Sequence, residues 1–369
     1  MKEEAVRIRA AVIAKAGGVF QVRDLELEEP RETEVLVRVA GTGVCHTDLA
    51  AARGFLPVMF PAVLGHEGAG VVERTGLRVT RVRPGDSVVL TWGSCGACGP
   101  CRRGRPAYCD RFFQYNFTGR RPDGTTPLRG GVGEVSGVFF GQSSWASHVV
   151  ADERNVVPVS SHLPLEKLGP LGCGVMTGAG AVVCALRPEP GSSLAVFGAG
   201  AVGLSAVMAA ALSGCDPLIA VDLVPERLEM ARELGATHTV QAGKEDPVRT
   251  IRSICRGGVD YSLECVGHPE VLRQAVEAIR PLGVCGLVGM ASPGTRAPLD
   301  MNTLLSGRTV RGIVEGDAVP DLLIPRMLAW YEAGKFPFDK LLSLYPLNDI
   351  TQAEEDMKAG RTVKPVLIP

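Results

Sequence analysis

Two segments decide the fold of this chain: Leu194–Gly203 reads LAVFGAGAVG, and Leu218–Asp222 reads LIAVD. Their order predicts a short buried strand, a glycine turn that opens a helix, and a second buried strand that ends at a carboxylate. Gly198, Gly200 and Gly203 fit the pattern G-x-G-x-x-G, which makes a tight turn, admits a pyrophosphate and lets the helix pack on the strand. The segments therefore predict dinucleotide binding at a helix N-terminus.

The same segments predict individual cofactor contacts. Asp222 stands where a carboxylate accepts hydrogen bonds from the adenosine ribose, and its charge would face the 2′-phosphate of NADP, so NAD is expected. The pyrophosphate is expected on the turn, whose residues are Gly198, Gly200, Ala201, Val202 and Gly203.

Composition narrows the class of protein. The formal net charge of -1 over 369 residues gives no electrostatic footprint for nucleic acid or an anionic membrane. Eleven cysteines behind a charged N-terminus indicate a reducing compartment, so a cytoplasmic protein without a signal peptide is expected. A charge-free run between Glu189 and Asp216 could suggest a membrane span, but the glycines at 198, 200 and 203 fit a buried strand-turn-helix better.

The chain divides into two patterns. Short alternating runs indicate a mostly antiparallel β domain up to about residue 160. Apolar strands then alternate with helical patterns, which is typical of a parallel doubly wound sheet. The C-terminal segments are expected to return to the first domain. The predicted division is therefore a domain of 1–164 and 313–369, with 165–312 inserted as a nucleotide-binding domain.

Four cysteines share one loop rich in glycine and proline, with the spacing C-x2-C-x2-C-x7-C: Cys95, Cys98, Cys101 and Cys109. Four thiolates in one short loop can surround a tetrahedral Zn²⁺. The competing interpretations are unrelated core cysteines, which the neighbouring Gly-Ser, Gly-Ala and Gly-Pro pairs disfavour, and an iron–sulfur cluster. A closed, structural zinc site is expected.

Three other loop segments carry ligand-like residues: GVCHTD (43–48), GHEG (65–68) and GCG (172–174). Taken alone, each segment is better explained by a cysteine of the core or by a histidine that is hydrogen-bonded rather than metal-bound. Together with the cysteine loop and the glycine turn, in this order, they resemble the zinc-dependent medium-chain alcohol dehydrogenases over nearly the whole chain. The resemblance implies a Rossmann sheet inserted in a GroES-like catalytic domain.

The resemblance also implies roles for single residues. Cys45, His66 and Cys173 would be the ligands of a catalytic zinc with one open position. Asp48 would orient the ligating histidine, and Glu67 would be the acidic neighbour that approaches the zinc during ligand exchange. Thr47 would accept the proton of the alcohol, and His46 and Lys364 would contact the cofactor pyrophosphate. Arg227 would contact the adenosine ribose, and Val266 is expected in the cofactor site.

Within that family, the segments 139–146, 168–174 and 312–317 look most like the aryl-alcohol (benzyl alcohol) dehydrogenases. This implies reversible, zinc- and NAD-dependent oxidation of a primary aryl or allylic alcohol to the aldehyde, by hydride transfer from a zinc alkoxide. Many relatives carry a histidine where this chain has Ala50, which leaves the exit of the proton open. Trp92 and the stretch 112–117 fit either a ring pocket or packing in the cysteine loop.

Two alternatives stay open at this stage. One is a dehydrogenase for thiol–aldehyde adducts of the formaldehyde type, for which Arg120 and Arg121 could provide a basic pocket mouth. The other is a non-catalytic cofactor-binding protein on the same fold, although retention of all three ligands disfavours it. The expected partners are an alcohol or aldehyde and a second copy of the chain, in a homodimer or homotetramer, with no nucleic acid and no membrane.

Overall fold

The structure, a computed structural model, describes residues 5–131 and 133–369 and separates into two compact units. The first unit holds the chain up to Cys173 together with Val319–Pro325 and Asp339–Pro369. The second holds Gly174–Ala318 and Arg326–Phe338. Each unit is described by itself.

This division differs from the predicted one at its edges. Residues 165–172 form short turns that contact strands of the first unit, so they stay with it. Residues 326–338 belong to the second unit, where the rings of Trp330 and Phe336 pair at 5.9 Å. Within helix α10 (Pro320–Glu332), the chain passes from the first unit to the second after Pro325. Sequence periodicity alone does not place such a change, because the helical pattern continues through it.

The first unit begins with a five-stranded sheet whose order is β4-β1-β2-β7-β8. All its strand pairs are antiparallel. The register matches Val6 with Leu27 and Ile13 with Phe20 along the full length of β1 and β2. The strands are β1 Val6–Ile13, β2 Phe20–Leu27, β4 Ala62–Val63, β7 Leu128–Gly130 and β8 Gly133–Val135.

A second, seven-stranded sheet of the first unit follows the order β10-β6-β5-β3-β18-β17, with β9 also paired to β3. The last strand, β18, pairs antiparallel with β3 through Val366 and Gly43, so the C-terminal segment returns to the first unit as predicted. The strands are β3 Glu34–Gly43, β5 Gly68–Thr75, β6 Ser87–Leu90, β9 His148–Asp152, β10 Val156–Val159, β17 Leu342–Pro346 and β18 Lys364–Ile368. The short helices of this unit are α1 His46–Ala52, α2 Gly99–Arg102, α3 Phe112–Asn116 and α11 Ile350–Lys358.

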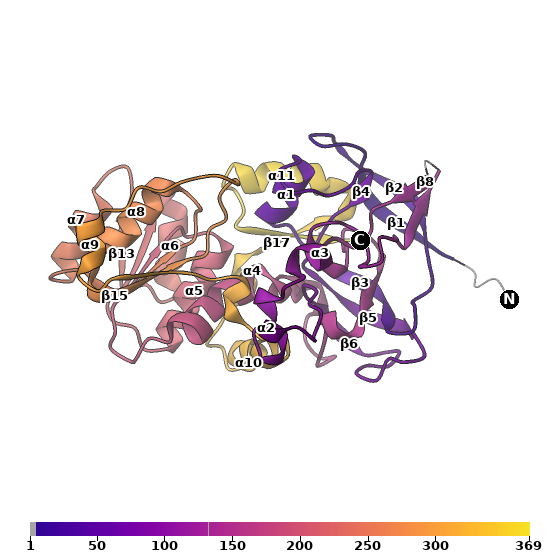
Figure 1. Cartoon of the computed structure of the whole chain (residues 1–369), viewed down its shortest axis with the longest axis horizontal. Helices are drawn as coiled ribbons and strands as arrows, with labels where there is room; N and C mark the ends of the chain where they lie inside the picture. The colour runs from indigo at the N-terminus through magenta and orange to yellow at the C-terminus, as the bar shows by residue number, and fades with distance from the viewer. Residues whose placement is uncertain (1–4, 132) are drawn as a thin grey trace. The chain divides into compact units, whose positions relative to one another are not determined.

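The second unit contains a six-stranded parallel sheet in the order β13-β12-β11-β14-β15-β16. The order reverses at β11, which is the switch point where doubly wound sheets bind their ligands. The strands are β11 Leu194–Phe197, β12 Leu218–Asp222, β13 His238–Gln241, β14 Val259–Glu264, β15 Ile279–Leu287 and β16 Thr309–Gly312. The helices are α4 Gly174–Gly180, α5 Ala201–Leu212, α6 Pro225–Glu233, α7 Pro247–Ile254, α8 Pro269–Ala278 and α9 Met301–Leu305 (Figure 1).

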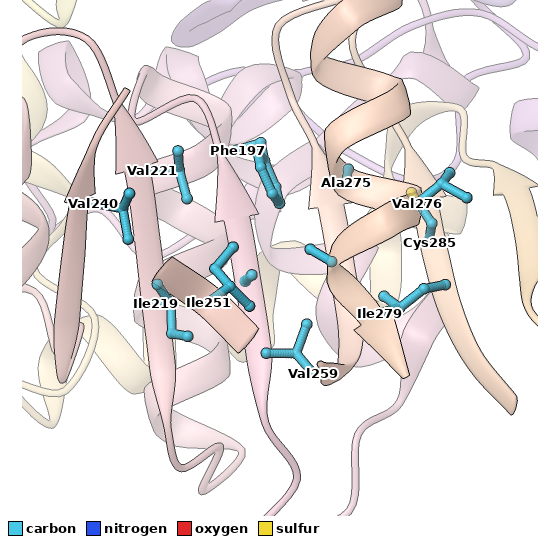
Figure 2. Packing of buried hydrophobic residues seen from close by; sticks show 12 residues of the cluster. Phe197, Ile219, Val221, Val240, Ile251, Val259, Ala275, Val276, Ile279 and Cys285 are labelled. Carbon is cyan, nitrogen blue, oxygen red and sulfur yellow. The ribbon is translucent and has the colours of Figure 1, made fainter. Parts of the chain in front are cut away.

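Alternate side chains of the central strands point to opposite faces of this sheet. Phe197 lies on the face where Ile251 of α7 and Val276 of α8 close the core shown in Figure 2. Val196 points the other way, toward α5, where a Cβ on Gly203 would lie 3.3 Å from its side chain. Helices on both faces explain why the strands read as continuous apolar runs rather than as alternating ones. Among the described residues, none of the helices has the length and apolar character needed to cross a membrane.

Candidate active site

Cys45 stands at the corner between β3 and α1, where it is the residue before the first helical turn. Its backbone is extended, and its N–H donates to the Asp48 carboxylate at 3.1 Å, which closes the turn. A carboxylate in the first turn of a helix satisfies a free backbone donor and complements the helix dipole. The sequence CHTD therefore folds so that Cys45 and Thr47 lie together, with the Cys45 Sγ 3.8 Å from the Thr47 Oγ1.

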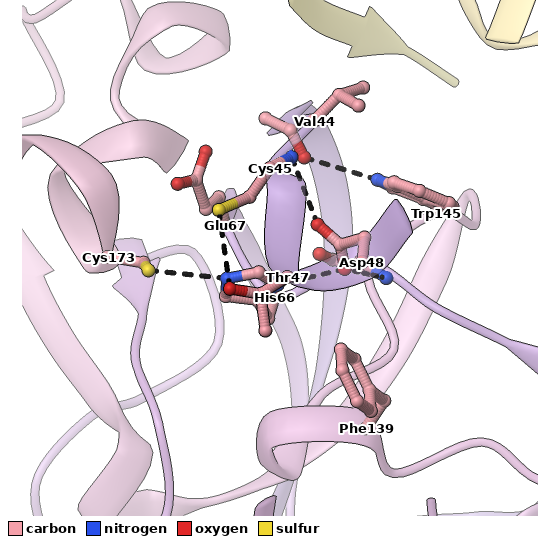
Figure 3. A network of polar contacts seen from close by, with 12 residues as sticks. Val44, Cys45, Thr47, Asp48, His66, Glu67, Phe139, Trp145 and Cys173 are labelled. Atoms are coloured by element: carbon pink, nitrogen blue, oxygen red, sulfur yellow. Dashed lines mark hydrogen bonds and ion pairs between the residues drawn. The ribbon is translucent and has the colours of Figure 1, made fainter. Parts of the chain in front are cut away.

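His66 lies between β4 and β5 and is oriented by the same carboxylate. Oδ1 of Asp48 accepts from Nδ1 of His66 at 2.8 Å and from the Gly65 N–H at 3.0 Å, and Asp48 and His66 are both buried (Figure 3). Since a carboxylate can only accept, His66 donates from Nδ1 and presents the lone pair of Nε2. That nitrogen faces the Cys173 Sγ at 3.2 Å. The contact predicted between Asp48 and the ligating histidine is therefore present.

Cys173 follows a short turn, Gly169–Gly172, that lies against β6. A Cβ at Gly172 would collide with the carbonyl of Leu90, so only glycine lets the turn approach this strand. The close approach brings Cys173 to Cys45 and His66, which are distant in sequence. Glu67 completes a group of four residues whose ligand atoms all lie within 4.8 Å of one another.

Glu67 is held by a buried cation. Both of its carboxylate oxygens lie 2.8 Å from the Lys364 Nζ, which also donates to the Val44 carbonyl at 3.2 Å. Burial lowers the pKa of Lys364, but the charges of Glu67 and Cys45 and the hydrogen bonds to Glu67 together raise this pKa above its ordinary value. Lys364 was predicted to contact the cofactor pyrophosphate. In the structure it is 3% exposed and its ammonium lies on Glu67, and the pyrophosphate contact stays a prediction.

This donor set suits a soft divalent metal. A hydrogen bond with Cys173, opposed by burial and reinforced by the Lys364 charge, lowers the pKa of the Cys45 thiol well below its ordinary value. Two sulfurs and one imidazole nitrogen match the ligands that Zn²⁺ prefers. The residues therefore fit the metal that the family resemblance implies for Cys45, His66 and Cys173.

A second donor set lies in the cysteine loop, where the ligand atoms of four cysteines also come within 4.8 Å of one another: Cys95, Cys98, Cys101 and Cys109. Backbone N–H groups point at the sulfurs, with Cys98 N donating to the Cys95 Sγ at 3.3 Å and Arg111 N donating to the Cys109 Sγ at 3.4 Å. Although burial opposes it, donation from Ala97 and Cys98 lowers the pKa of Cys95 to about 6. Burial raises the pKa of Cys101 and of Cys109, so the fit rests on the arrangement: four sulfurs that meet in one loop match a closed zinc site.

The glycine turn has the predicted geometry. Gly198 has φ +96°, which favours glycine, and a Cβ at Gly203 would collide with the Gly198 carbonyl. The carboxylate of Asp222 accepts from the backbone N–H of Ala199 at 2.6 Å and of Val224 at 2.9 Å. Each oxygen keeps a further lone pair, so the carboxylate can hold the turn and still accept from a ribose.

Other predicted positions are distributed around these sites. His46 is exposed, Thr47 and Ala50 are partly buried, and Val266 is exposed after β14. The Nε of Arg227 is buried without a hydrogen-bond partner among the described residues, which is consistent with a donor that serves a ligand. Both predicted zinc sets are brought together within the first unit.

The two arginines considered for the basic pocket mouth of a thiol–aldehyde adduct site are both engaged in ion pairs. Arg121 is 5% exposed, and its guanidinium binds Glu34 at 2.6 Å and Glu28 at 3.0 Å. Arg120 binds Glu134 at 2.7 Å. Because their guanidinium groups are occupied in this way, Arg120 and Arg121 do not by themselves support the adduct activity.

Sequence reasoning missed two residues that hold His66. The Phe140 ring stacks on the imidazole with centroids 4.5 Å apart. The Gln142 amide donates to the His66 carbonyl at 3.0 Å and accepts from the Gly68 N–H at 2.9 Å. The only signal was their place in the segment 139–146, which had been interpreted for substrate class alone.

Comparisons with known proteins agree with this geometry. Residues 31–161 match the alcohol dehydrogenase GroES-like domain, and residues 201–332 match the zinc-binding dehydrogenase family. The chain is 44% identical to geraniol dehydrogenase from Castellaniella defragrans over 369 residues, which is 99% of each chain.

Two solved structures are also similar. An alcohol dehydrogenase zinc-binding domain protein from Burkholderia ambifaria has 50% identity and a TM-score of 0.97, over 99% of this chain and 100% of that one. Benzyl alcohol dehydrogenase from Acinetobacter calcoaceticus has 46% identity and a TM-score of 0.95, over 98% of this chain and 99% of that one. Zinc and a nicotinamide dinucleotide are the cofactors of such an enzyme. The chain therefore belongs to the zinc-dependent medium-chain alcohol dehydrogenases and is an oxidoreductase.

Proposed function

We propose that this enzyme oxidises a primary aryl or allylic alcohol to the aldehyde, reversibly, with NAD as the hydride acceptor. The observation that carries the proposal is the Thr47 hydroxyl beside the donor set of Cys45, His66 and Cys173. A hydroxyl next to three metal ligands is the arrangement that alcohol oxidation requires, because the alcohol must lose a proton as well as a hydride.

In this proposal, Cys45, His66 and Cys173 hold the catalytic zinc. Bound zinc supplies Lewis acidity, which lowers the pKa of an alcohol toward neutrality. Asp48 holds one edge of the His66 ring through the 2.8 Å hydrogen bond, so that Nε2 is directed at the set. Glu67 is the fourth group within reach, and Lys364 restrains it. The second set, in the loop 95–109, would hold a structural zinc, because four cysteines leave no position for substrate.

Thr47 is the proposed proton acceptor. Its hydroxyl can take a proton from the alcohol and pass one on, since a hydroxyl both donates and accepts. Ala50 has no side-chain acceptor, so we infer that the proton leaves through water, the cofactor ribose or the exposed imidazole of His46. Because position 50 has no histidine, the last proton transfer is made by groups outside the protein core.

The second unit supports NAD in three ways. The glycine turn provides backbone N–H groups for the pyrophosphate. Asp222 presents a carboxylate to the ribose, and this charge opposes a 2′-phosphate. Exposed apolar side chains follow the carboxyl ends of four parallel strands, where the flat rings of a dinucleotide can pack: Leu223 after β12, Val266 after β14, Met290 after β15 and Val314 after β16. When bound, NAD accepts the hydride from the carbinol carbon.

The substrate class is supported by aromatic side chains beside the metal set. The Phe139 ring lies 5.9 Å from the His66 ring, and the Phe140 ring lies 4.5 Å from it. Both rings are buried, so they act on a substrate only by making the surroundings of the metal set apolar and aromatic. The similarity to a geraniol dehydrogenase and a benzyl alcohol dehydrogenase agrees with this class.

An initial-rate panel tests the proposal. Benzylic, allylic and short aliphatic alcohols are each assayed with NAD and with NADP. We expect kcat/KM to be higher for benzyl alcohol than for ethanol, and higher with NAD than with NADP. Asp222→Ser should narrow or reverse the cofactor preference. Ethanol outperforming benzyl alcohol would contradict the substrate class, and equal use of both cofactors would contradict the role of Asp222.

We also propose a cytoplasmic homodimer or homotetramer. Strand β16 lies at the edge of the parallel sheet, and three large apolar side chains near that edge are more than three-quarters exposed: Leu282 at 80%, Met301 at 78% and Leu305 at 81%. An open strand edge with exposed apolar residues is a common site of self-association. Sedimentation velocity of the natural chain and of Leu305→Glu tests this, and a monomeric natural chain would contradict it.

A further inference from the structure

Phe140 has an unusual backbone for a bulky residue. It lies in the turn Phe139–Gly141 with φ 50°, in the left-handed region that favours glycine, and it is 3% exposed. Such a conformation is strained for a residue with a side chain and persists only where the surroundings determine it. The conformation places the Phe140 ring on the face of the His66 imidazole, with an interplanar angle of 29°.

The surroundings of Phe140 are other aromatic rings. Phe139 lies 4.9 Å away at 66°, Phe117 lies 5.2 Å away at 87°, and Phe112 lies 6.4 Å away at 88°. Edge-to-face arrangements of this kind are favourable for aromatic pairs. Phe140 is therefore held on several sides, and its remaining face is against His66.

Two of those rings come from the segment that follows the cysteine loop. Phe112 is the first residue of α3, and its N–H donates to the Cys109 carbonyl at 2.8 Å. Phe117 is the residue after α3, with its ring 6.0 Å from that of Phe112. A continuous set of contacts thus runs from Cys109 through Phe112 and Phe140 to His66, all within the first unit.

Asp48 alone does not fix the His66 ring. A single hydrogen bond at Nδ1 sets one edge of the imidazole but leaves the ring able to tilt about that bond. A stacked ring opposes this tilt, because tilting would press the imidazole into the phenyl face. Support of a ligating histidine by its neighbours typically changes metal affinity 10–100-fold.

We propose that Phe140 is a positioning residue for His66, and that the cysteine loop holds Phe140 in place through Phe112 and Phe117. Retention of metal by Cys45, His66 and Cys173 then depends on a loop that provides none of their ligands. The inference rests on the metal assignment of the proposed function but not on the identity of the alcohol.

The test is the rate of zinc release from the full-length, zinc-loaded protein into excess chelator. His66→Ala, which lacks one ligand, identifies the phase that belongs to the cysteine loop. We expect Phe140→Leu to accelerate the other phase by about 10-fold. Phe112→Leu, which does not touch His66, should accelerate the same phase by about 3-fold. Phe113→Leu is the matched control, because Phe113 is in the same helix, is 57% exposed and reaches Phe140 only through Phe117, whose ring is 5.5 Å away. It should accelerate the phase less than Phe112→Leu does.

Cobalt substitution gives an independent measurement. The visible ligand-field bands of the Cys45–His66–Cys173 set, obtained by subtracting the spectrum of His66→Ala, should shift in Phe140→Leu and shift less in Phe113→Leu. Thermal unfolding identifies a general loss of fold. If Phe140→Leu does not fold, the zinc release rate and the cobalt bands of Phe112→Leu test the inference instead.

Two results would overturn the inference. In the first, Phe140→Leu and Phe112→Leu release zinc at the natural rate while Asp48→Asn releases it faster, so that the hydrogen bond alone fixes His66. In the second, both phases accelerate equally, so that the rings support the fold and not the site. If the natural chain does not oxidise alcohols, the proposed function is contradicted. The zinc release rates can still be interpreted in that case, because they do not depend on turnover.

Discussion

The four sulfurs of Cys95, Cys98, Cys101 and Cys109 come from one loop, whereas Cys45, His66 and Cys173 come from three separate segments. The loop set is mostly half-buried and ordered by backbone N–H groups of its own segment. The assembled set is supported from many parts of the first unit, by Asp48, Lys364, Gln142 and Phe140. The difference teaches that a local set depends on its own loop, and an assembled set depends on the fold.

Thr47→Ala should have the largest effect and acts only on the assembled set. Removing a positioned proton acceptor should lower alcohol oxidation by about 10²–10⁴-fold. Zinc content and thermal stability should stay at natural values, because Thr47 is not a ligand. Thr47→Ser keeps the hydroxyl and is the control, with a mild effect expected. Near-normal single-turnover rates of Thr47→Ala across the pH range would move the proton to another path.

Cys101→Ser should have the next largest effect and acts on the loop set. It opens a four-thiolate site whose metal binding contributes to folding, so Tm should fall by roughly 10 °C or more. Activity per remaining folded protein should fall less. Differential scanning calorimetry with specific activity measures both. Intact stability with vanished turnover would mean that the structural and catalytic sites are exchanged.

Glu67→Gln tests how much the buried ion pair beside the assembled set contributes to the free energy of unfolding. The change leaves the Lys364 ammonium buried without a full counter-charge, and breaking such a pair costs about 3–5 kcal/mol. Urea unfolding should show this loss. Glu73→Gln, which breaks an exposed pair with Arg38, is the control and should cost less than about 1 kcal/mol. Equal losses in the two variants would mean that burial adds nothing to the Glu67 pair.

The smallest effect is expected at the surface ion pair of Asp123 and Arg31. Hydrogen bonds from Thr125, then the Arg31 charge, lower the pKa of Asp123 below its ordinary value. A lowered folded-state pKa gives stability that is present above the unfolded pKa of about 3.9 and is lost as pH falls toward the folded value. Asp123→Asn should lower Tm at pH 7 by roughly 1–2 °C, with the difference shrinking below pH 4. A Tm difference between the two proteins that grows as the pH falls would contradict a lowered pKa of Asp123 in the folded state.

The same contrast explains what the sequence could predict. The cysteine loop and the glycine turn are contiguous, so their spacing alone indicated a metal site and a dinucleotide site. Cys45, His66 and Cys173 are far apart, and only resemblance to a family joined them. The Phe140 contact was not predictable, because no local pattern indicates a left-handed phenylalanine or the partner of its ring. The pairing of Lys364 with Glu67 was missed for a similar reason, since it depends on β18 lying beside β3.

The most direct test of the assembled catalytic site is zinc per chain measured together with benzyl alcohol oxidation, in the natural chain and in Cys173→Ala. The natural chain should contain two zincs and oxidise the alcohol with NAD. Cys173→Ala should stay folded, retain one zinc in the cysteine loop and lose alcohol oxidation. A folded Cys173→Ala that keeps two zincs and natural turnover would contradict the assignment of Cys45, His66 and Cys173 as the catalytic metal site.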